Sequence, residues 1–332
     1  MNDTPTLDAA PGRPRISSEK VKNGLIRYAM VWVMLLIIAY FSYKSARFTT
    51  PDNLRTIAVA AAPFALIALG QTLVILTGGI DLSVGSIIAL SAMTAAFVVK
   101  DHPERLLLAV VVAVLVGMVA GAINGVLVAY IQIPPFIATL GMLTTARGLA
   151  YVVGGGAPIN GLPENFGSIA NTKILGLEIP VITMIVAILA LAFVMSKTAY
   201  GMRVYAVGGN PMASQIAGVK SKRILFSVYA LSGLLAGISG IMLSSRVISG
   251  PPNLGTGYEL DAIAAVVIGG ASLMGGRGTV WGTALGLLLI QTLNNGLDIL
   301  VVPAYWQSVI KGVLIAAAVA VDVWAMKRRD NT

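Results

Sequence analysis

The sequence predicts an all-α, polytopic membrane protein, and three observations support this prediction. Of the 332 residues, 57% are hydrophobic and 11% are charged, whereas soluble domains carry about 25% charged residues. The apolar residues fall into runs long enough to cross a bilayer. Glycines interrupt some of these runs, and the backbone that such a break exposes must be covered by protein or by a water-filled path.

About ten transmembrane segments, some of them broken or short, account for every apolar run. They lie near 25–43, 56–77, 84–99, 106–130, 136–153, 178–195, 224–245, 260–274, 279–297 and 306–326. No stretch of soluble composition between them is long enough for a separate fold. We therefore expect one transmembrane domain over 25–326, between an N-terminal tail (1–24) and a C-terminal tail (327–332).

The basic residues predict the orientation. If the N-terminus is cytoplasmic, most lysines and arginines fall in cytoplasmic pieces, including the terminal Lys327, Arg328 and Arg329. This distribution satisfies the positive-inside rule. Ten segments return the chain to its starting side, so we expect both termini to be cytoplasmic. Eight or twelve segments would satisfy the same parity.

The composition excludes several kinds of chemistry. The chain has no cysteine and one histidine, so it cannot form disulfides, cysteine nucleophiles or multi-histidine metal sites. It contains no G-x-x-x-x-G-K-[ST] phosphate loop, so any ATP that drives it must bind to another chain. Its net charge of +9 is spread along the ends of apolar runs and forms no aromatic-interleaved basic patch. We expect no catalytic residues, no metal, no bound cofactor and no nucleic acid.

Residues 77–86, TGGIDLSVGS, place a glycine-broken turn inside an apolar run. Paired breaks of this kind indicate a transport pathway, and the GGxxLxxG spacing of residues 78–85 recurs at 269–276. Asp81 has no basic neighbour in its turn. Its carboxylate either caps the following helix or binds a coupling ion or proton, which would make the protein a proton-coupled secondary transporter.

Charged residues gather toward the predicted outer ends of several segments. Three are cations (Arg147, Arg246, Lys311) and three are anions (Glu259, Asp261, Asp298), and we expect the two groups to face each other. Because charges inside a bilayer need partners or a cavity, they either tie helix ends together or form a polar vestibule for a hydroxylated solute. The candidate pathway residues are Asp81, Ser83, Asn124, Arg147, Glu259, Asp261, Asn294 and Asn295.

Two polar connections separate the apolar runs. Residues 154–177 are rich in Gly, Pro and Asn, and parity places them outside, where they either dock a partner or form a solvated linker. Residues 196–223 form the largest internal loop.

Within that internal loop, the sequence predicts a short helix from Pro211 to Ala217. Asn210 suits its N-cap, proline suits its first position and Gly218 suits its C-terminal stop. Met212, Ala213 and Ile216 would form a small apolar knob on the cytoplasmic side. Alternatively, the helix lies on the membrane surface.

Five strings resemble the membrane permeases of bacterial ribose-type sugar ABC importers. They are LGQTLVILTGGIDLSVGSIIAL (69–90), PPFIATLGML (134–143), AVGGNPMASQIAGV (206–219), GTGYELDAIAAVVIGGASLMGGRGTVWGT (255–283) and NNGL (294–297). The resemblance covers nearly all of the chain after residue 50. It favours the monosaccharide branch of this superfamily over the branched-chain amino acid and nucleoside branches, which remain as alternatives.

The resemblance implies a multi-pass subunit of the bacterial inner membrane, surrounded by lipid. It would pair with a second permease subunit, either a copy of itself or a paralogue, and import a sugar such as ribose, xylose or galactose by alternating access. A periplasmic sugar-binding protein would deliver the sugar, and a separate cytoplasmic ATPase chain would hydrolyse ATP. The residues similar to the helix that contacts this ATPase are Gly209, Asn210, Pro211, Met212, Ala213, Ile216, Ala217 and Gly218. Relatives often carry an acidic residue and alanine where this chain has Pro211 and Met212, so its ATPase contacts are expected to differ in detail.

Overall fold

Helix α3 (Pro51–Leu76) is the central element of the computed structural model, which describes residues 29–330. All of its residues from 61 to 76 are buried. The helix begins where Thr50 accepts a hydrogen bond from the Asn53 N–H at 3.4 Å, with proline at the first helical position, and both residue types favour a helix start. It ends just before Gly78, which has a φ of +79°.

Helix α3 packs directly against the long helix α11 (Ser221–Val247). Helix α11 in turn packs against α4 (Val84–Val99) and α5 (Leu106–Ala129), which also contact each other. Glycines let α5 and α11 touch along their backbones: a Cβ added to Gly117 would lie 2.5 Å from the Gly233 carbonyl oxygen, and one added to Gly121 would overlap the Tyr229 carbonyl oxygen. Small residues at such crossings permit the close approach that membrane helices use for association.

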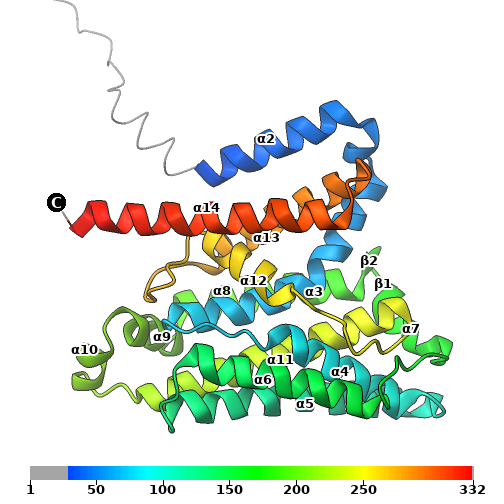
Figure 1. Cartoon of the computed structure of the whole chain (residues 1–332), viewed down its shortest axis with the longest axis horizontal. Helices are drawn as coiled ribbons and strands as arrows, with labels where there is room; N and C mark the ends of the chain where they lie inside the picture. Colours follow the sequence, from blue (N-terminus) through cyan, green and yellow to red (C-terminus); the bar gives the residue numbers. More distant parts are fainter. Residues whose placement is uncertain (1–28, 331–332) are drawn as a thin grey trace, which may run out of the picture.

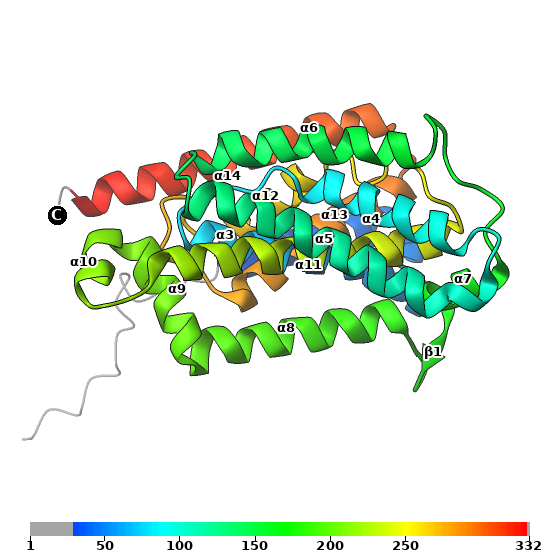
Figure 2. The same ribbon diagram turned by 90° about the horizontal axis from the view of Figure 1, so that it is seen from below.

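The remaining long helices form the periphery of the bundle (Figures 1 and 2). Helices α12 (Tyr258–Ile268) and α13 (Val280–Ile299) pack against α3, and α2 (Ala29–Lys44) and α14 (Ala304–Asp330) cover them. Helices α6 (Pro135–Val153) and α8 (Ile179–Lys197) lie on other sides of the core. Exposed aliphatic and aromatic side chains such as Leu36, Val152 and Phe193 cover these helices, as expected for surfaces that face lipid.

Short elements mark the two ends of the bundle. Helices α9 (Ala199–Gly209) and α10 (Pro211–Ile216) lie together with loop 269–279 at one end, which we call the α10 end. Helix α7 (Glu164–Asn171) and strands β1 (Lys173–Ile174) and β2 (Leu177–Glu178) lie at the opposite end, the α7 end. The 3-10 turns η1 (Ala46–Thr49) and η2 (Pro103–Arg105) connect long helices.

The two strands form a small antiparallel hairpin in which Lys173 is opposite Glu178. Leu175 and Gly176 between them both have positive φ values, as the favoured two-residue hairpin turns require. The described part of the chain is therefore mostly, but not entirely, helical. Connection 154–177 is also more ordered than a solvated linker, because α7 buries Phe166, Gly167 and Ala170.

Each of the ten predicted apolar segments corresponds to a helix of the structure. In the described part of the chain, five helices are long and apolar enough to cross a membrane: Pro51–Leu76, Pro103–Ala129, Pro135–Val153, Ile179–Lys197 and Ser221–Val247. Ten crossings, a single transmembrane domain and cytoplasmic termini stay predictions. Connections 154–177 and 196–223 do lie at opposite ends of the bundle, and α2 begins and α14 ends toward the α10 end (Figure 1).

One predicted boundary was wrong. Segment 260–274 was too long, because α12 ends at Ile268 and Gly270 takes a φ of +86°. Helix α14 continues to Asp330, past the predicted segment 306–326, but a helix can extend beyond the membrane, so that boundary stays a prediction. The N-terminal tail 1–24 lies outside the described residues.

Candidate functional site

The first helix break is organised around Asp81. Its side chain is fully buried, and its carboxylate accepts hydrogen bonds from Ser83 N (3.0 Å), Ser83 Oγ (2.6 Å) and Ser232 Oγ (3.0 Å). Asn124 Nδ2 in turn donates to Ser83 Oγ at 2.8 Å. The N-cap of helix α4 is Ser83, and no described side chain caps the helix, so the bond from the Ser83 N–H orders the turn before the helix and the capping role of Asp81 stays a prediction.

Two further side chains hold the backbone of the same break. The Gln71 amide nitrogen donates to the Asp81 carbonyl at 3.1 Å and its oxygen accepts from the Asp81 N–H at 3.2 Å, in the orientation that satisfies both groups. Tyr229 is fully buried, and a Cβ added to Gly79 would overlap its hydroxyl. Side chains from α3, α5 and α11 thus hold the break in place. Among the described residues, no cation donates a hydrogen bond to the Asp81 carboxylate.

The second break, residues 269–279, meets the first one at the α10 end. The Gly276 N–H donates to the Leu76 carbonyl at the end of α3 (2.9 Å). A Cβ added to Gly275, which has a φ of +85°, would lie 2.8 Å from Gly78 N. The two copies of the GGxxLxxG spacing, distant in the sequence, therefore lie side by side with their backbones in contact.

The end of α9 completes this contact. A Cβ added to Gly208 would overlap the Leu76 carbonyl oxygen and lie 2.8 Å from Gly276 N. Tyr205 Oη also donates to the Gly278 carbonyl at 2.9 Å. We call the backbone contact of Leu76, Gly78, Gly208, Gly275 and Gly276 the glycine junction.

Helix α10 follows the glycine junction directly. The Asn210 side chain accepts a hydrogen bond from the Ala213 N–H at 2.9 Å, and Gly218 has a φ of +79°, so the predicted helix, its cap and its stop are confirmed. The exposed fractions of Met212 and Ile216 are 70% and 83%. Helix α10 lies at the end of the bundle (Figure 2), so these two residues give that end an exposed apolar surface. Which partner it contacts stays a prediction.

The charges predicted to face each other are mostly not paired. Asp261 does form an ion pair with Lys311 Nζ (2.9 Å). Arg147 instead donates to the carbonyls of Pro252 (2.8 Å) and Leu254 (2.9 Å). The prediction of three cations facing three anions holds in part, because Lys311 pairs with Asp261 and Arg147 lies near Glu259. The hydrogen bonds of Arg147 nevertheless go to backbone carbonyls, which accept from a guanidinium group as carboxylates do.

The remaining predicted charges make other contacts. Asp298 accepts a hydrogen bond from Gln307 Nε2 at 2.8 Å. The Glu259 carboxylate lies against Gly85 at the start of α4, where a Cβ would overlap its Oε2 atom. Arg246 lines a pocket at the α7 end.

The two candidate asparagines of α13 differ. Asn295 exchanges hydrogen bonds with Asn53 of α3, at 2.8 and 2.9 Å, so it ties two helices together. Asn294 has a buried Oδ1 atom for which the described residues provide no hydrogen-bond partner. The eight candidate pathway residues therefore occupy several clusters rather than one site, and their roles stay predictions.

A polar pocket of about 440 Å³ opens between α3, α7, α8 and α11 at the α7 end. Arg55 forms an ion pair with Glu178, and this contact lowers the pKa of the Glu178 carboxyl. Only 6% of the Glu178 side chain is exposed. The polar lining residues are Asp52, Arg55, Thr56, Asn171, Glu178 and Arg246. Sequence reasoning missed this pocket, because its walls come from four separated segments.

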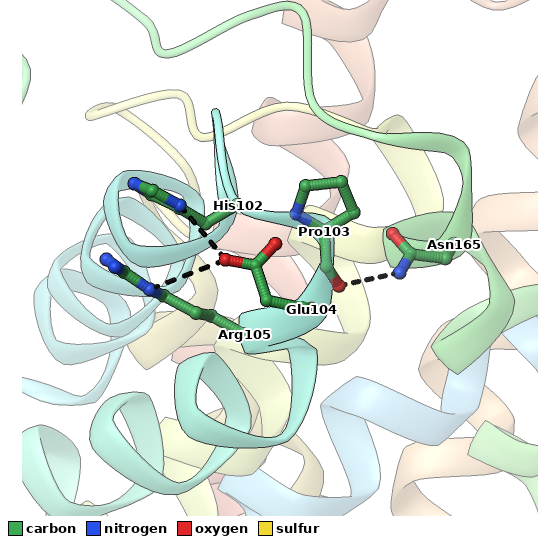
Figure 3. A network of polar contacts seen from close by, with 5 residues as sticks. All are labelled: His102, Pro103, Glu104, Arg105 and Asn165. Atoms are coloured by element: carbon green, nitrogen blue, oxygen red, sulfur yellow. Dashed lines mark hydrogen bonds and ion pairs between the residues drawn. The ribbon is translucent and has the colours of Figure 1, made fainter.

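A second polar group helps to place α7. His102 Nδ1 lies 3.0 Å and Arg105 Nε 3.8 Å from the same carboxylate oxygen of Glu104, and Asn165 Nδ2 donates to the Pro103 carbonyl at 2.8 Å (Figure 3). The ion pairs are exposed and contribute little stability. The Asn165 bond, however, attaches the first turn of α7 to η2.

Comparisons with known proteins agree with the sequence resemblance. A family model described as the permease component of the branched-chain amino acid transport system matches residues 53–319. The chain is 43% identical over 310 residues to the ribose import permease protein of Bacillus subtilis, covering 93% of this chain and 95% of the relative. For the ribose import permease protein of Escherichia coli, the identity is 43% over 305 residues, covering 91% and 95%.

A further relative has a different sugar in its name. The chain is 36% identical over 316 residues to the D-allose transport system permease protein of Escherichia coli, covering 93% of this chain and 97% of the relative. No solved structure matches the chain.

Proposed function

This chain belongs to the family of branched-chain amino acid transport system permease components, and from this premise we propose that it is the membrane-spanning subunit of an ATP-driven importer for a monosaccharide. The relatives named for ribose and D-allose support a sugar over an amino acid or a nucleoside. The chain supplies the multi-pass inner-membrane part of the importer. A separate ATPase chain supplies the energy, and an external binding protein delivers the sugar.

One observation carries this proposal: the exposed helix α10 is continuous with the glycine junction. Only Asn210 separates α10 from α9, and Gly208 of α9 touches both the end of α3 and the second break. A displacement of α10 by a docked ATPase therefore reaches both broken segments through backbone contacts. Packed interiors have low compressibility and transmit such displacements.

The proposed cycle alternates access between the two faces. ATP-dependent closure of the ATPase pair moves α10, and the glycine junction carries this motion to the Asp81 break and to loop 269–279. The helices of two permease subunits then open toward one side or the other. The ATP-bound and nucleotide-free forms of the ATPase pair bind the two permease conformations with different affinities, and this difference drives the shift between them.

Reconstituted vesicles test the proposal. The purified chain is incorporated with its ATPase and binding protein, and labelled D-ribose uptake is measured with and without ATP. Uptake should require ATP and the binding protein, and a proton uncoupler should not abolish it. If the chain alone takes up sugar and an uncoupler abolishes this uptake, the result would instead support the second candidate, a proton-coupled carrier that uses Asp81. One observation favours that candidate: the Asp81 carboxylate is buried, and none of its hydrogen bonds in the described part of the chain comes from a cation.

A further inference from the structure

We propose that the polar pocket at the α7 end is a binding site for the transported sugar, the position at which it first enters the permease. This inference rests on the proposed function and adds the location of recognition. None of the eight pathway residues predicted from the sequence lines this pocket. The proposal rests on three features of the pocket: the chemistry of its lining residues, the fixed position of one carboxylate and the helices that form its walls.

The lining matches a small polyhydroxylated solute. Two guanidinium groups (Arg55, Arg246), two carboxylates (Asp52, Glu178) and the Asn171 amide offer donors and acceptors in comparable numbers. A ligand of one charge sign would meet like charges on the wall, whereas sugar hydroxyls both donate and accept. Apolar side chains, including Met242 and Pro63, suit the C–H surfaces of a sugar ring. Ligand sites commonly combine apolar walls with a few polar groups in this way.

Glu178 is held in place before any ligand arrives. Its side chain is almost fully buried, and Arg55 on α3 forms an ion pair with it. Asn171 closes α7 by donating to the Gly167 carbonyl at 2.9 Å. Because these groups are already positioned, a ligand would lose less free energy in ordering them.

The walls connect the pocket to the Asp81 break. Helix α3 carries Arg55 at its α7 end and, further along, Gln71, which brackets the Asp81 backbone. Helix α11 carries Arg246 at its α7 end and, near its middle, Ser232, which donates to the Asp81 carboxylate. A sugar in the pocket therefore contacts the same two helices that hold the first break.

Two other cavities suit different ligands. The groove between α4, α5 and α6 is lined by aliphatic residues with only Thr145 as a polar group, so it offers almost no hydrogen bonds to a sugar. The cavity beside Lys100 and His102 lies at the corner where α4 and η2 meet, and neither α3 nor α11 contributes to its walls. Of these three cavities in the described part of the chain, the pocket at the α7 end combines polar groups suited to a sugar with walls from α3 and α11, the two helices that hold the first break.

Single-cysteine protection tests the proposal directly, because the natural sequence contains no cysteine. Asn171→Cys is introduced into the full chain, reconstituted with its ATPase and binding protein, and modified with a membrane-impermeant maleimide. D-ribose and D-allose are added at increasing concentration, with leucine as a zwitterionic comparison. The matched control is Leu175→Cys, which is 99% exposed in the neighbouring hairpin.

We expect at least one sugar to slow modification of residue 171 by about tenfold at saturation, because the bound sugar covers the thiol. A tenfold change corresponds to about 1.4 kcal/mol. Residue 175 should react at an unchanged rate, and leucine should protect neither. Thr56→Cys, on the α3 wall of the same pocket, should show the same protection as residue 171. Equal protection of cysteines on two different helices would show that the sugar occupies the pocket, whereas a local change in α7 would protect residue 171 but leave residue 56 reactive.

Three results would overturn the proposal. The first is that no sugar changes the modification rate at residues 171 and 56 although the same vesicles take up sugar. This result would leave the proposed function intact. Another is equal protection at 171 and 175. The third is protection by the sugar-free binding protein that added sugar does not increase, which would make the pocket a protein-docking surface. Absence of ATP-driven uptake by the wild type, in contrast, would remove the proposed function itself.

A kinetic measurement gives an independent readout. Arg246→Met removes one guanidinium group from the pocket and keeps a long, flexible side chain. It should raise the KM for sugar uptake by about tenfold, the cost of one hydrogen bond to a charged group, and leave kcat unchanged. Arg105→Met, at the same end of the bundle but outside this pocket, is the control. A fall in kcat with no change in KM would contradict a binding role for Arg246.

Discussion

The two ends of the bundle are held together by different kinds of contact. At the α10 end, α3, α9 and loop 269–279 meet backbone to backbone through the glycine junction. At the α7 end, α3, α7 and α8 are connected through side chains, including the Arg55–Glu178 pair, and enclose a polar pocket. Backbone contacts dominate at the α10 end, with the Tyr205 hydroxyl as an additional link, whereas side chains dominate at the α7 end.

This difference teaches how one membrane subunit can separate energy input from recognition. Backbones in contact have no rotamers with which to absorb a displacement, so motion of one segment must move the next. Side chains around a pocket can exchange their contacts for contacts with a solute. The α10 end is therefore suited to coupling, and the α7 end is suited to binding.

The largest expected effect comes from adding one methyl group to the glycine junction. In Gly208→Ala, the new Cβ overlaps the Leu76 carbonyl oxygen, so α9 must move away from α3. ATP-driven uptake should fall by at least about tenfold, since over-packing a tight contact costs about 1–3 kcal/mol. In the adjacent control, Gly209→Ala, the nearest atom would be the Gly276 Cα at 3.9 Å, and uptake should be retained. Equal uptake by the two variants would show that the glycine junction does not transmit motion.

A second large effect is expected at the exposed surface of α10. Ile216→Asp places a charge in the proposed apolar contact with the ATPase, whereas Gln215→Asp changes an exposed polar neighbour. The first variant should lose co-purification of the ATPase and keep the thermal unfolding temperature of the wild type. The second should keep both. Retained co-purification of Ile216→Asp would remove α10 from the ATPase contact.

Asp81, which lies between the two ends, should show an intermediate effect. Asp81→Asn keeps an acceptor for the Ser83 N–H, whereas Asp81→Ala leaves the buried hydroxyls of Ser83 and Ser232 without it. Each unsatisfied buried group costs about 1–3 kcal/mol, so the alanine variant should unfold at the lower temperature. Uptake by the asparagine variant, measured per amount of folded protein, should stay close to that of the wild type. Loss of uptake by asparagine with unchanged stability would indicate a proton or ion ligand instead of a cap.

The smallest effect is expected from the ion pair at the α7 end and depends on pH. Arg55 lowers the pKa of Glu178 in the folded protein. The resulting stabilisation is complete above the ordinary glutamate pKa of about 4.3 and is lost as the pH falls through the lowered folded value. The difference in unfolding temperature between wild type and Glu178→Gln should therefore shrink on acidification. In an Arg55→Gln background this pH dependence should weaken, and an unchanged dependence would contradict the assignment to the pair.

Much of the fold could be predicted from the sequence because its signals are local. Length and apolarity located the helices, and Asn210, Pro211 and Gly218 defined α10 because capping depends on adjacent residues. The break at residues 78–83 could be predicted because its glycines are also a local signal. Helix α12 was overextended, since the apolar run continues past the positive φ of Gly270.

The sites were harder to predict because they depend on contacts between distant segments. The repeated GGxxLxxG spacing indicated two breaks but not that they touch, and nothing near Gly208 indicates the carbonyl of Leu76 beside it. The pocket likewise combines Arg55 with Glu178 and Arg246 from two other parts of the chain. Charges at one predicted depth suggested pairs, but backbone carbonyls satisfied Arg147 instead.

Pulsed spin-label distance measurements test most directly the central claim, that α10 and the two breaks move as one unit relative to the α7 end. Labels are attached to cysteines introduced at Gln215 on α10, at Met274 in the second break (73% exposed) and at Leu175 in the hairpin. Labelled subunits are diluted with unlabelled ones and reconstituted with the ATPase and binding protein. On addition of ATP, the 215–274 distance should stay constant while the 215–175 and 274–175 distances change. A change in the 215–274 distance with a constant 274–175 distance would contradict the account.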